Sequence, residues 1–452
     1  MLVMTDDEVK ENKKKICNKK VIFCGFFDKG SELKLKFLEK VACKAVKRRW
    51  DVVFVDQGVL TKKKFPSFKG SIYLHFYWSE GLLVRRLLNT LWILIKLPRQ
   101  ALEAWRVDFL TNKGKQEYTW LRSILGIGGL VEFFNSHMKL KEGDLLVLWA
   151  YYWPFHRLID PIVKSKKAKV VYLEYASLPG FVIFSDAAGF QGRLTNIDHK
   201  LFNILPVRKI DMKKAQAYIQ FVIRQKKSMK IYRLKDMPTD IKIDKRKKIL
   251  VIGSELPATG MIPKWAKSSR MFSPIFVSNE DLLLSIAKKA KKRNWLLIYK
   301  KHPQMLHYPS LTVRRVKLDG YPIAFIKNVE IHEVLKQSDV VISLGSSVLQ
   351  LGLMREKPGV LVGTTGLNRK GCCYEISNRQ DLTVAIDKAV KFGLQNTQKQ
   401  SFIEYVAREL KYHCFALTDN YKKYCPRGPE SAWQSLEKYH ETGRREVFLK
   451  RD

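Results

Sequence analysis

Short apolar runs recur along the first half of the chain, and amphipathic stretches separate them. Between residues 32 and 49, apolar side chains recur every three or four positions, which is the spacing of a helix with one buried side. The short runs are rich in β-branched and aromatic residues, as strands in a sheet covered on both faces are. We predict strands at residues 20–25, 51–56, 71–76, 145–149 and 169–174. This alternation of strands and helices is typical of an α/β domain.

A second series of the same kind begins after a polar stretch at residues 236–248, DMPTDIKIDKRKK. Its predicted elements are strands at 249–253, 295–299, 340–344 and 359–362, and helices at 281–293 and 331–338. We therefore predict an α/β fold with two Rossmann-like domains that face each other across a cleft. The predicted divisions are a flexible basic tail at 1–19, a first domain at 20–240, a second domain at 246–395, and C-terminal helices at 396–452 that pack back on the cleft. Ligands of such sheets bind beyond the carboxyl ends of the strands, so we expect the site there.

Composition and charge narrow the classes of partner. The chain has 452 residues, of which 46% are hydrophobic and 12% aromatic, as expected of two globular domains. Its 83 Lys and Arg against 43 Asp and Glu give a formal net charge of +40, which attracts nucleic acids, anionic membranes and phosphorylated substrates alike. The basic residues are spread along the chain, and we find no nucleic-acid-binding motif such as a paired Cys/His finger. We therefore rank a nucleic-acid partner below an enzyme that binds phosphorylated substrates.

Cysteine usage and hydropathy give an expected location. The seven cysteines include no CxxC pair, so we expect reduced, buried thiols in a cytoplasmic protein and no metal site. No run reaches the roughly 20 apolar residues of a membrane span. The nearest, GLLVRRLLNTLWILIKL at 81–97, is interrupted by Arg85, Arg86 and Lys96. We favour a core helix whose charged groups reach solvent, but it also fits a basic amphipathic helix at the inner face of an anionic membrane.

The predicted strand at 295–299 leads directly into a group of basic residues. Lys300 and His302 are two positions apart, so in extended chain they share one face at the strand's carboxyl end and present two donors to one anion. Pro303 then ends the strand. Taken alone, the tetrapeptide fits equally well a surface lysine pair beside an incidental histidine.

A second strand end supplies the rest of a phosphate site. The strand at 340–344 is followed by Gly345, Ser346 and Ser347, and then by the helical run VLQLGLMRE. Serine hydroxyls and free backbone N–H groups at a helix start favour an anion, although serines also cap helices without binding anything. Together with Lys300 and His302, this turn predicts a phosphate-binding site. The remaining predicted donor-binding residues are Gly253 and Gln350.

At these residues the sequence resembles a known family. The segments WLLIYKKHP and HEVLKQSDVVISLGSSVLQLGLMREKPGVLVG are similar to the C-terminal domain of the capsular polysaccharide synthesis family, bacterial glycosyltransferases of GT-B architecture that include Kdo transferases. In the first half, LEYASLPGFVIFSDAAGFQGRL at 173–194 resembles the family's Glu-x-Gly, Leu-Pro-Gly and Asp-x-x-Gly segment. The helix-like QAYIQFVIRQKKSMKIY is a weaker match. The resemblance extends over about residues 145–365.

The resemblance implies a metal-independent glycosyltransferase without a cofactor. Its second domain would hold a nucleotide sugar, such as CMP-Kdo or a similar CMP-ulosonic acid, and its first domain a glycan or glycolipid acceptor. Carried over to this chain, Lys300, His302, Ser346 and Ser347 would contact the donor phosphate, with His302 also counted as catalytic. Glu174 would be the general base for the acceptor hydroxyl, and Asp186 is the reserve candidate.

Two positions depart from the family pattern. Ala176 stands where the family usually has a glycine. Leu351 stands where the family's helix has a glutamate expected to bind the ribose hydroxyls, and Gln350 is its neighbour on a different part of the helix. The nucleotide therefore stays open.

Two other functions also fit these features. One is a CDP-polyol phosphotransferase of the teichoic-acid type, which shares the His-Pro and Ser-Ser features and would be expected to use a further catalytic histidine, for which His156 is the candidate. The other is a basic protein without catalysis that binds polyanions or a membrane. Loss of activity in His156→Ala would favour the polyol phosphotransferase. Binding to polyanions without nucleotide selectivity would favour the non-catalytic binding protein.

Overall fold

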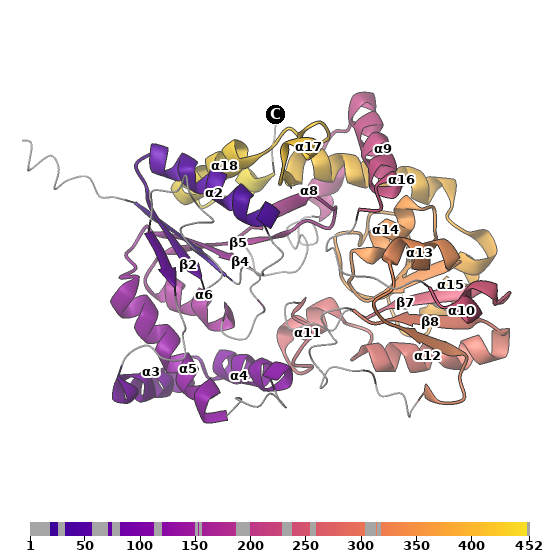
Figure 1. Cartoon of the computed structure of the whole chain (residues 1–452), viewed down its shortest axis with the longest axis horizontal. Helices are drawn as coiled ribbons and strands as arrows, with labels where there is room; N and C mark the ends of the chain where they lie inside the picture. Colours follow the sequence, from indigo (N-terminus) through magenta and orange to yellow (C-terminus); the bar gives the residue numbers. More distant parts are fainter. Residues whose placement is uncertain are drawn as a thin grey trace, which may run out of the picture.

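The computed structural model of the chain describes residues 19–25, 32–56, 71–74, 82–112, 120–149, 152, 156–186, 199–227, 237–253, 259–302, 313 and 318–449. These residues form two α/β domains, each built on its own sheet (Figure 1). The two-domain α/β fold predicted from the sequence is confirmed. The expected N-terminal tail, except Lys19, lies outside the described residues.

The first sheet has seven strands in the order β13-β6-β5-β4-β1-β2-β3. The strands are β1 Lys20–Cys24, β2 Asp51–Asp56, β3 Ser71–Leu74, β4 Leu145–Trp149, β5 Lys169–Tyr175, β6 Phe181–Ser185 and β13 Phe415–Ala416. Strands β1 to β5 run parallel, whereas β6 pairs antiparallel with both β5 and β13. The five predicted strands are present, and β6 and β13 are additions that the hydrophobic pattern did not predict.

Helices cover both faces of the first sheet. On one face, α2 Glu32–Lys47 lies beside α18 Pro429–Thr442, and the rings of Trp50 and Trp433 meet edge to face, with 5.2 Å between their centroids. The other face carries α3, α4, α5 and α6, which lie on the far side of the sheet from α2 and α18 in Figure 1. Their bounds are α3 Leu83–Lys96, α4 Pro98–Asn112, α5 Trp120–Glu132 with a π-helical extension at Phe133–His137, and α6 His156–Ser165.

The second sheet has six strands, all parallel, in the order β12-β11-β10-β7-β8-β9. The strands are β7 Lys248–Ile252, β8 Leu296–Lys300, β9 Ile323–Ile326, β10 Val340–Ser343, β11 Gly359–Leu361 and β12 Tyr374–Glu375. Counted along the chain from β7, this is the 3-2-1-4-5-6 order of a dinucleotide-binding fold. The order reverses between β7 and β10, so the carboxyl ends of these two strands are where a ligand is expected.

Helices also cover both faces of the second sheet. Apolar residues of α12 and α15 pack on one face, and those of α13 and α14 on the other. The helices of this domain are α10 Thr239–Ile243, α11 Lys267–Phe272, α12 Asn279–Arg293, α13 Ile331–Gln337, α14 Val348–Met354 and α15 Asp381–Phe392. Helix α14 begins directly after the Ser346-Ser347 turn, which the sequence analysis predicts to bind phosphate.

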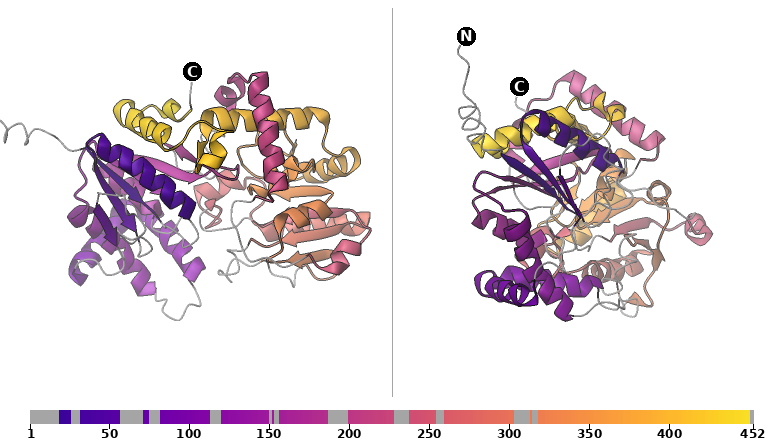
Figure 2. Two further views of the ribbon diagram at one scale, coloured as in Figure 1. Left: turned by 45° about the horizontal axis from the view of Figure 1, so that its top comes forward. Right: turned by 60° about the vertical axis from the view of Figure 1, so that its left-hand side comes forward.

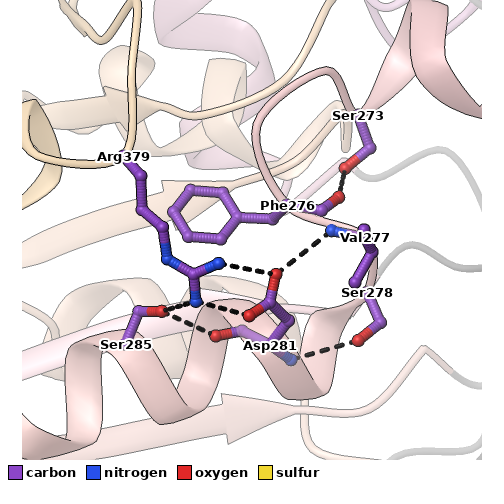
Figure 3. A network of polar contacts seen from close by, with 7 residues as sticks. All are labelled: Ser273, Phe276, Val277, Ser278, Asp281, Ser285 and Arg379. Carbon is purple, nitrogen blue, oxygen red and sulfur yellow. Dashed lines mark hydrogen bonds and ion pairs between the residues drawn. The ribbon is translucent and has the colours of Figure 1, made fainter.

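A polar network fixes the start of α12 (Figure 3). Ser278 Oγ accepts a hydrogen bond from the Asp281 backbone N–H at 3.1 Å, which caps the helix. The Asp281 carboxylate in turn accepts from the Val277 backbone N–H at 3.2 Å and from Arg379 Nη1 at 3.3 Å. Arg379 also donates to Ser285 Oγ at 2.6 Å and lies over the Phe276 ring. The network therefore holds the loop between α11 and α12 against the segment that precedes α15.

The C-terminal segment returns from the second domain to the first. Helix α16 Asn396–Arg408 packs on α9 Lys209–Arg224, and α18 packs on α2 (Figure 2). Between them, β13 pairs with β6 of the first sheet. The shorter elements here are α8 His199–Ile204, the π-helix η7 Glu409–His413, α17 Asp419–Lys422 and the 3-10 helix η8 Arg445–Phe448. One apolar cluster includes Phe181 of the first sheet, Tyr405 of α16 and Leu250 of the second sheet. The two domains are therefore packed together through the C-terminal helices.

Candidate active site

The carboxyl ends of the two sheets lie next to each other. Arg157 of α6 is 2% exposed, and its Nη2 donates to the backbone oxygen of Ile262 in the second domain at 2.7 Å. The ring of Tyr152, just beyond β4, meets that of Phe272 edge to face, with 5.7 Å between their centroids. Glu103 pairs with Arg157 Nη1 at 3.1 Å and neutralises this buried charge. The end of β4 is thereby anchored to the segment that follows β7.

A second bridge passes through Tyr405 of α16. Its hydroxyl lies 3.2 Å from Ser177 Oγ, in the turn after β5, and accepts from Gln350 Nε2 of α14 at 3.2 Å. Gln350 is 2% exposed, so its side chain is directed into this contact between the domains. Leu351 is buried in the apolar cluster shared by the domains, where an ionised glutamate would be strongly disfavoured. Gln350 is therefore a bridging residue in this structure.

Hydrogen bonds to a buried side chain hold the serine turn after β10, residues 345–347, in place. Ser343, the last residue of β10, is fully buried, and its Oγ accepts hydrogen bonds from the backbone N–H groups of Gly345 at 3.1 Å and Ser346 at 2.7 Å. Ser346 Oγ accepts from the Val348 N–H at 3.2 Å, whereas Ser347 makes no capping bond. The sequence reasoning missed Ser343, although a serine at the end of the apolar strand VVIS was a signal for it.

We expect Ser343→Ala to lower the free energy of unfolding by about 1–3 kcal/mol, because two buried N–H groups lose their acceptor. The turn should also loosen, which should raise the KM for the donor. Urea unfolding and donor kinetics measure the two effects. The matched control is Ser338→Ala, a buried serine whose hydroxyl only donates to Val334 O at 2.7 Å. Ser338→Ala should leave the donor KM unchanged. If Ser343→Ala also left the donor KM unchanged, the turn would not be part of the donor site.

Lys300 lies at the carboxyl end of β8 and is only 7% exposed. Burial lowers the pKa of its ammonium group to about 8, and the Glu330 carboxylate opposes this shift. Glu330 caps α13 by accepting from the backbone N–H groups of His332 and Glu333 at 3.0 and 2.9 Å. An ammonium buried in this way gains stability from an anion at the strand end.

His302 follows Lys300 by two positions and is partly buried. The backbone N–H of Lys301 between them donates to Ile326 O at 3.0 Å, which continues the pairing of β8 with β9. That Lys300 and His302 share one face stays a prediction from strand alternation. Pro303 lies outside the described residues.

Gly253 follows β7 and lies between the Lys300 strand and the serine turn. Its backbone N–H donates to Lys300 O at 3.1 Å. A Cβ atom here would be 2.4 Å from the Tyr299 hydroxyl oxygen, so a larger residue would displace the Tyr299 side chain. Likewise, a Cβ at Gly345 would lie 3.0 Å from Met261 Cε. Both glycines allow close packing around the site.

On the first sheet, Glu174 is the second-last residue of β5 and is partly buried. The rings of Trp149 and Tyr175 meet on the α2 side of the sheet, with 4.9 Å between their centroids, whereas alternation along β5 directs the Glu174 side chain to the α6 side. Lys34 of α2 is 1% exposed, and its Nζ lies 3.8 Å from the centroid of the Trp149 ring. The sequence reasoning missed Lys34, which occupies the apolar side of its helix. Glu174 therefore lies near the carboxyl end of β5, on the opposite face of the sheet from these aromatic rings and the buried cation.

Asp186 lies at the other end of the same hairpin. In the antiparallel register, Glu174 is opposite Ile183 and Tyr172 is opposite Ser185, so Asp186 is near the amino end of β5. Burial raises the pKa of Tyr439 in α18 to about 12, and the Asp186 charge adds to this effect. Along β6, Asp186 is three residues beyond Ile183, the partner of Glu174, so Glu174 stays the first candidate base and Asp186 the reserve candidate.

The described residues show no candidate metal-ion site, and they place His156 at the buried start of α6. Within the described ranges, no group of three or more His, Cys, Asp and Glu side chains could hold a metal ion. His156 is the first residue of α6 and is 1% exposed. The cysteines that are described are all free thiols, and all but Cys43 are buried.

Glycosyltransferases are among the solved structures similar to this chain. Two are described as KpsC from Thermosulfurimonas dismutans. Its beta Kdo 2,7 transferase is 18% identical, with 68% of this chain and 88% of that chain covered and a TM-score of 0.41. Its beta Kdo 2,4 transferase is 15% identical, with coverages of 58% and 78% and a TM-score of 0.41. The calicheamicin glycosyltransferase CalG4 is 11% identical, with coverages of 94% and 99% and a TM-score of 0.34. No protein-family model and no curated protein sequence match the chain.

Three groups therefore define the candidate site. The second sheet supplies Lys300 and His302 after β8, and the Ser346-Ser347 turn after β10. These strands are the two neighbours of β7. The first sheet supplies Glu174 from β5, next to the bridge at Ser177.

Proposed function

We propose that the protein is a glycosyltransferase that moves a sugar from a nucleotide-activated donor to a hydroxyl group of a glycan or glycolipid. The observation that best supports this is the placement of a buried lysine and a braced serine turn on the two strands that flank β7, at the carboxyl edge of a 3-2-1-4-5-6 sheet. Phosphates of nucleotides bind at this edge in folds of this order. Glu174 lies at the corresponding edge of the other domain.

The proposed chemistry divides between the domains. Lys300, His302 and the serine hydroxyls would stabilise the charge that develops on the nucleotide phosphate as it leaves. Helix α14 has only seven residues, so we attribute the stabilisation of the phosphate charge to these side chains more than to the helix dipole. Glu174 would remove the proton from the acceptor hydroxyl, and no step calls for a metal ion.

The donor, the acceptor and the location are finer parts of the same proposal. CMP-Kdo or another CMP-ulosonic acid is the first donor to test, with surface polysaccharide precursors as acceptors. We propose that the reaction takes place at the inner face of a membrane, where a glycolipid acceptor would be held. His156→Ala separates sugar transfer from polyol-phosphate transfer, because only the second reaction would be abolished by this change.

The proposal is tested by nucleotide selectivity. We expect one of CMP, UDP, GDP and CDP to raise the melting temperature of the protein more than the others, and its sugar conjugate to be turned over. Inorganic polyphosphate is the control for charge alone, because a +40 chain binds any polyanion. Equal stabilisation by polyphosphate and by all four nucleotides would support a non-catalytic polyanion-binding protein instead.

A further inference from the structure

Helix α3 packs on the first domain through its polar side. Its buried residues are Thr90 and Ile93. Thr90 Oγ1 lies 2.8 Å from Arg86 O and 3.2 Å from Ile124 O of α5, and Asn89 Nδ2 donates to Glu132 Oε2 at 3.0 Å. At Gly128 of α5, a Cβ atom would lie 1.9 Å from Arg86 O. Close backbone approach and polar contacts therefore hold this helix in place, with Ile93 as its buried apolar contact.

The opposite side of α3 is apolar and exposed. Nine of the exposed large apolar side chains among the described residues lie between Leu82 and Ile95. Leu88 is 59% exposed, Leu91 is 54% and Ile95 is 74%. The favoured interpretation of this segment as a core helix was therefore wrong, because its leucines face outward. We call this surface the α3 face, formed by Leu83, Val84, Leu88, Leu91, Trp92 and Ile95.

Basic residues surround the α3 face. Residues 82–99 contain no Asp or Glu and four cations, of which Arg85, Lys96 and Arg99 flank this face, whereas Arg86 Nε donates to Leu125 O of α5 at 3.4 Å on the packed side. The side chains of Arg85 and Arg99 are 66% and 62% exposed, although each pairs with a carboxylate, at 3.6 and 3.5 Å. An apolar strip between cations matches lipid acyl chains next to anionic headgroups.

The length of α3 fixes how it would lie. Its 14 residues extend about 21 Å, which is shorter than the hydrocarbon core of a bilayer. None of the helices described here is long and apolar enough to cross a membrane. With its polar side bound to α5, the helix can present only one face, so it would lie parallel to the membrane surface. Trp92, 41% exposed, is of the residue type enriched at that interface.

We propose that the α3 face docks the protein on an anionic phospholipid bilayer. A second copy of this chain, with its net charge of +40, or an apolar protein partner would cover the leucines, but neither supplies the negative charge that Arg85, Lys96 and Arg99 would face on an anionic bilayer. Anionic headgroups match the cations, while the acyl chains beneath them match the leucines. The inference does not rest on the transferase chemistry, because it concerns a surface of the first domain formed by other residues.

Vesicle co-sedimentation of the full chain tests this proposal. Wild type should bind vesicles of equal parts phosphatidylglycerol and phosphatidylcholine, and bind pure phosphatidylcholine vesicles much more weakly. The variant Leu88→Ser/Leu91→Ser/Ile95→Ser changes only exposed side chains, so the core packing should survive. Its partition onto the mixed vesicles should fall at least about a hundredfold, since each buried leucine contributes roughly tenfold.

The matched control changes three exposed apolar residues of the second domain. Val277→Ser/Val384→Ser/Phe392→Ser alters side chains that are 64%, 53% and 55% exposed, and vesicle binding should not change. Lys96→Glu should weaken binding to the mixed anionic vesicles and leave binding to pure phosphatidylcholine vesicles unchanged. Equal binding of wild type and the α3 variant to the mixed vesicles would overturn the proposal. It would also be overturned if wild type did not bind vesicles but formed a dimer in vesicle-free buffer, and the α3 variant did not form this dimer. Nucleotide-induced stabilisation should be the same in all these variants, so failure here is distinct from failure of the transferase proposal.

Discussion

The Glu174→Gln variant should lose about 10² to 10⁴ in kcat while its affinity for the donor nucleotide stays close to that of wild type. Glutamine has nearly the shape of glutamate, so packing at the end of β5 should be retained. It cannot accept the proton of the acceptor hydroxyl, so the loss should fall on the chemical step. Steady-state kinetics with a productive nucleotide sugar, together with calorimetry of nucleotide binding, separates the two quantities.

Asp186→Asn is the matched control for this prediction. It makes the same chemical change in a carboxylate of the same hairpin, at the end distant from the second domain. We expect kcat to stay within a few-fold of wild type, because Asp186 acts on Tyr439 in α18. An unchanged kcat in Glu174→Gln, or an equal loss in both variants, would contradict the assignment of Glu174 as the base.

The affinity for the donor nucleotide should fall as the pH rises above about 8, which is the pKa to which burial lowers Lys300. A phosphate stabilises the ammonium form, so binding above this pH requires uptake of a proton. The apparent affinity should therefore be level below pH 8 and decrease about tenfold per pH unit above it. Lys300→Met should remove this slope and weaken binding at lower pH.

Lys370→Met is the control for the pH dependence. Burial also lowers the pKa of Lys370 to about 8, but this residue lies over the Phe202 ring, away from β8. The Lys370→Met variant should keep the slope that Lys300→Met loses. If the slope followed Lys370 instead, the phosphate would lie closer to Tyr405 and Gln350 than we propose.

Much of the fold could be predicted because buried parallel strands are continuous apolar runs. β4 and β10 are of this kind, and both were found from the pattern alone. β12 and β13 have two residues each, which is too few to show the alternation of apolar and polar positions typical of a strand. β6 was not predicted because it lies within residues 173–194, which were interpreted as a family motif. Short strands of this kind are defined by the neighbours with which they pair.

The positions of the proposed donor residues could be predicted because each lies at or just after the carboxyl end of an apolar strand. Lys300 is the last residue of β8 and Ser346 lies three residues after β10, and both strands are neighbours of β7, so the parallel topology brings them to one edge. Arg157 was missed because its role depends on hydrogen bonds that no spacing reveals, whereas Ser343, a serine at the end of the apolar strand VVIS, did give a signal. The distance along the hairpin between Glu174 and Asp186 depends on the antiparallel register of β5 with β6, which the sequence motif did not reveal.

Calorimetric titration of wild type and Lys300→Met with the nucleotide selected by the stability panel, below pH 8, tests the central claim most directly. A hydrogen bond from a charged group contributes about 1.5–3 kcal/mol, so Lys300→Met should bind about ten to a hundred times more weakly. Lys301→Met, one position along the chain, should bind like wild type because alternation places it on the other face of the strand. Equal affinities for wild type and Lys300→Met would contradict the assignment of Lys300 to the donor phosphate.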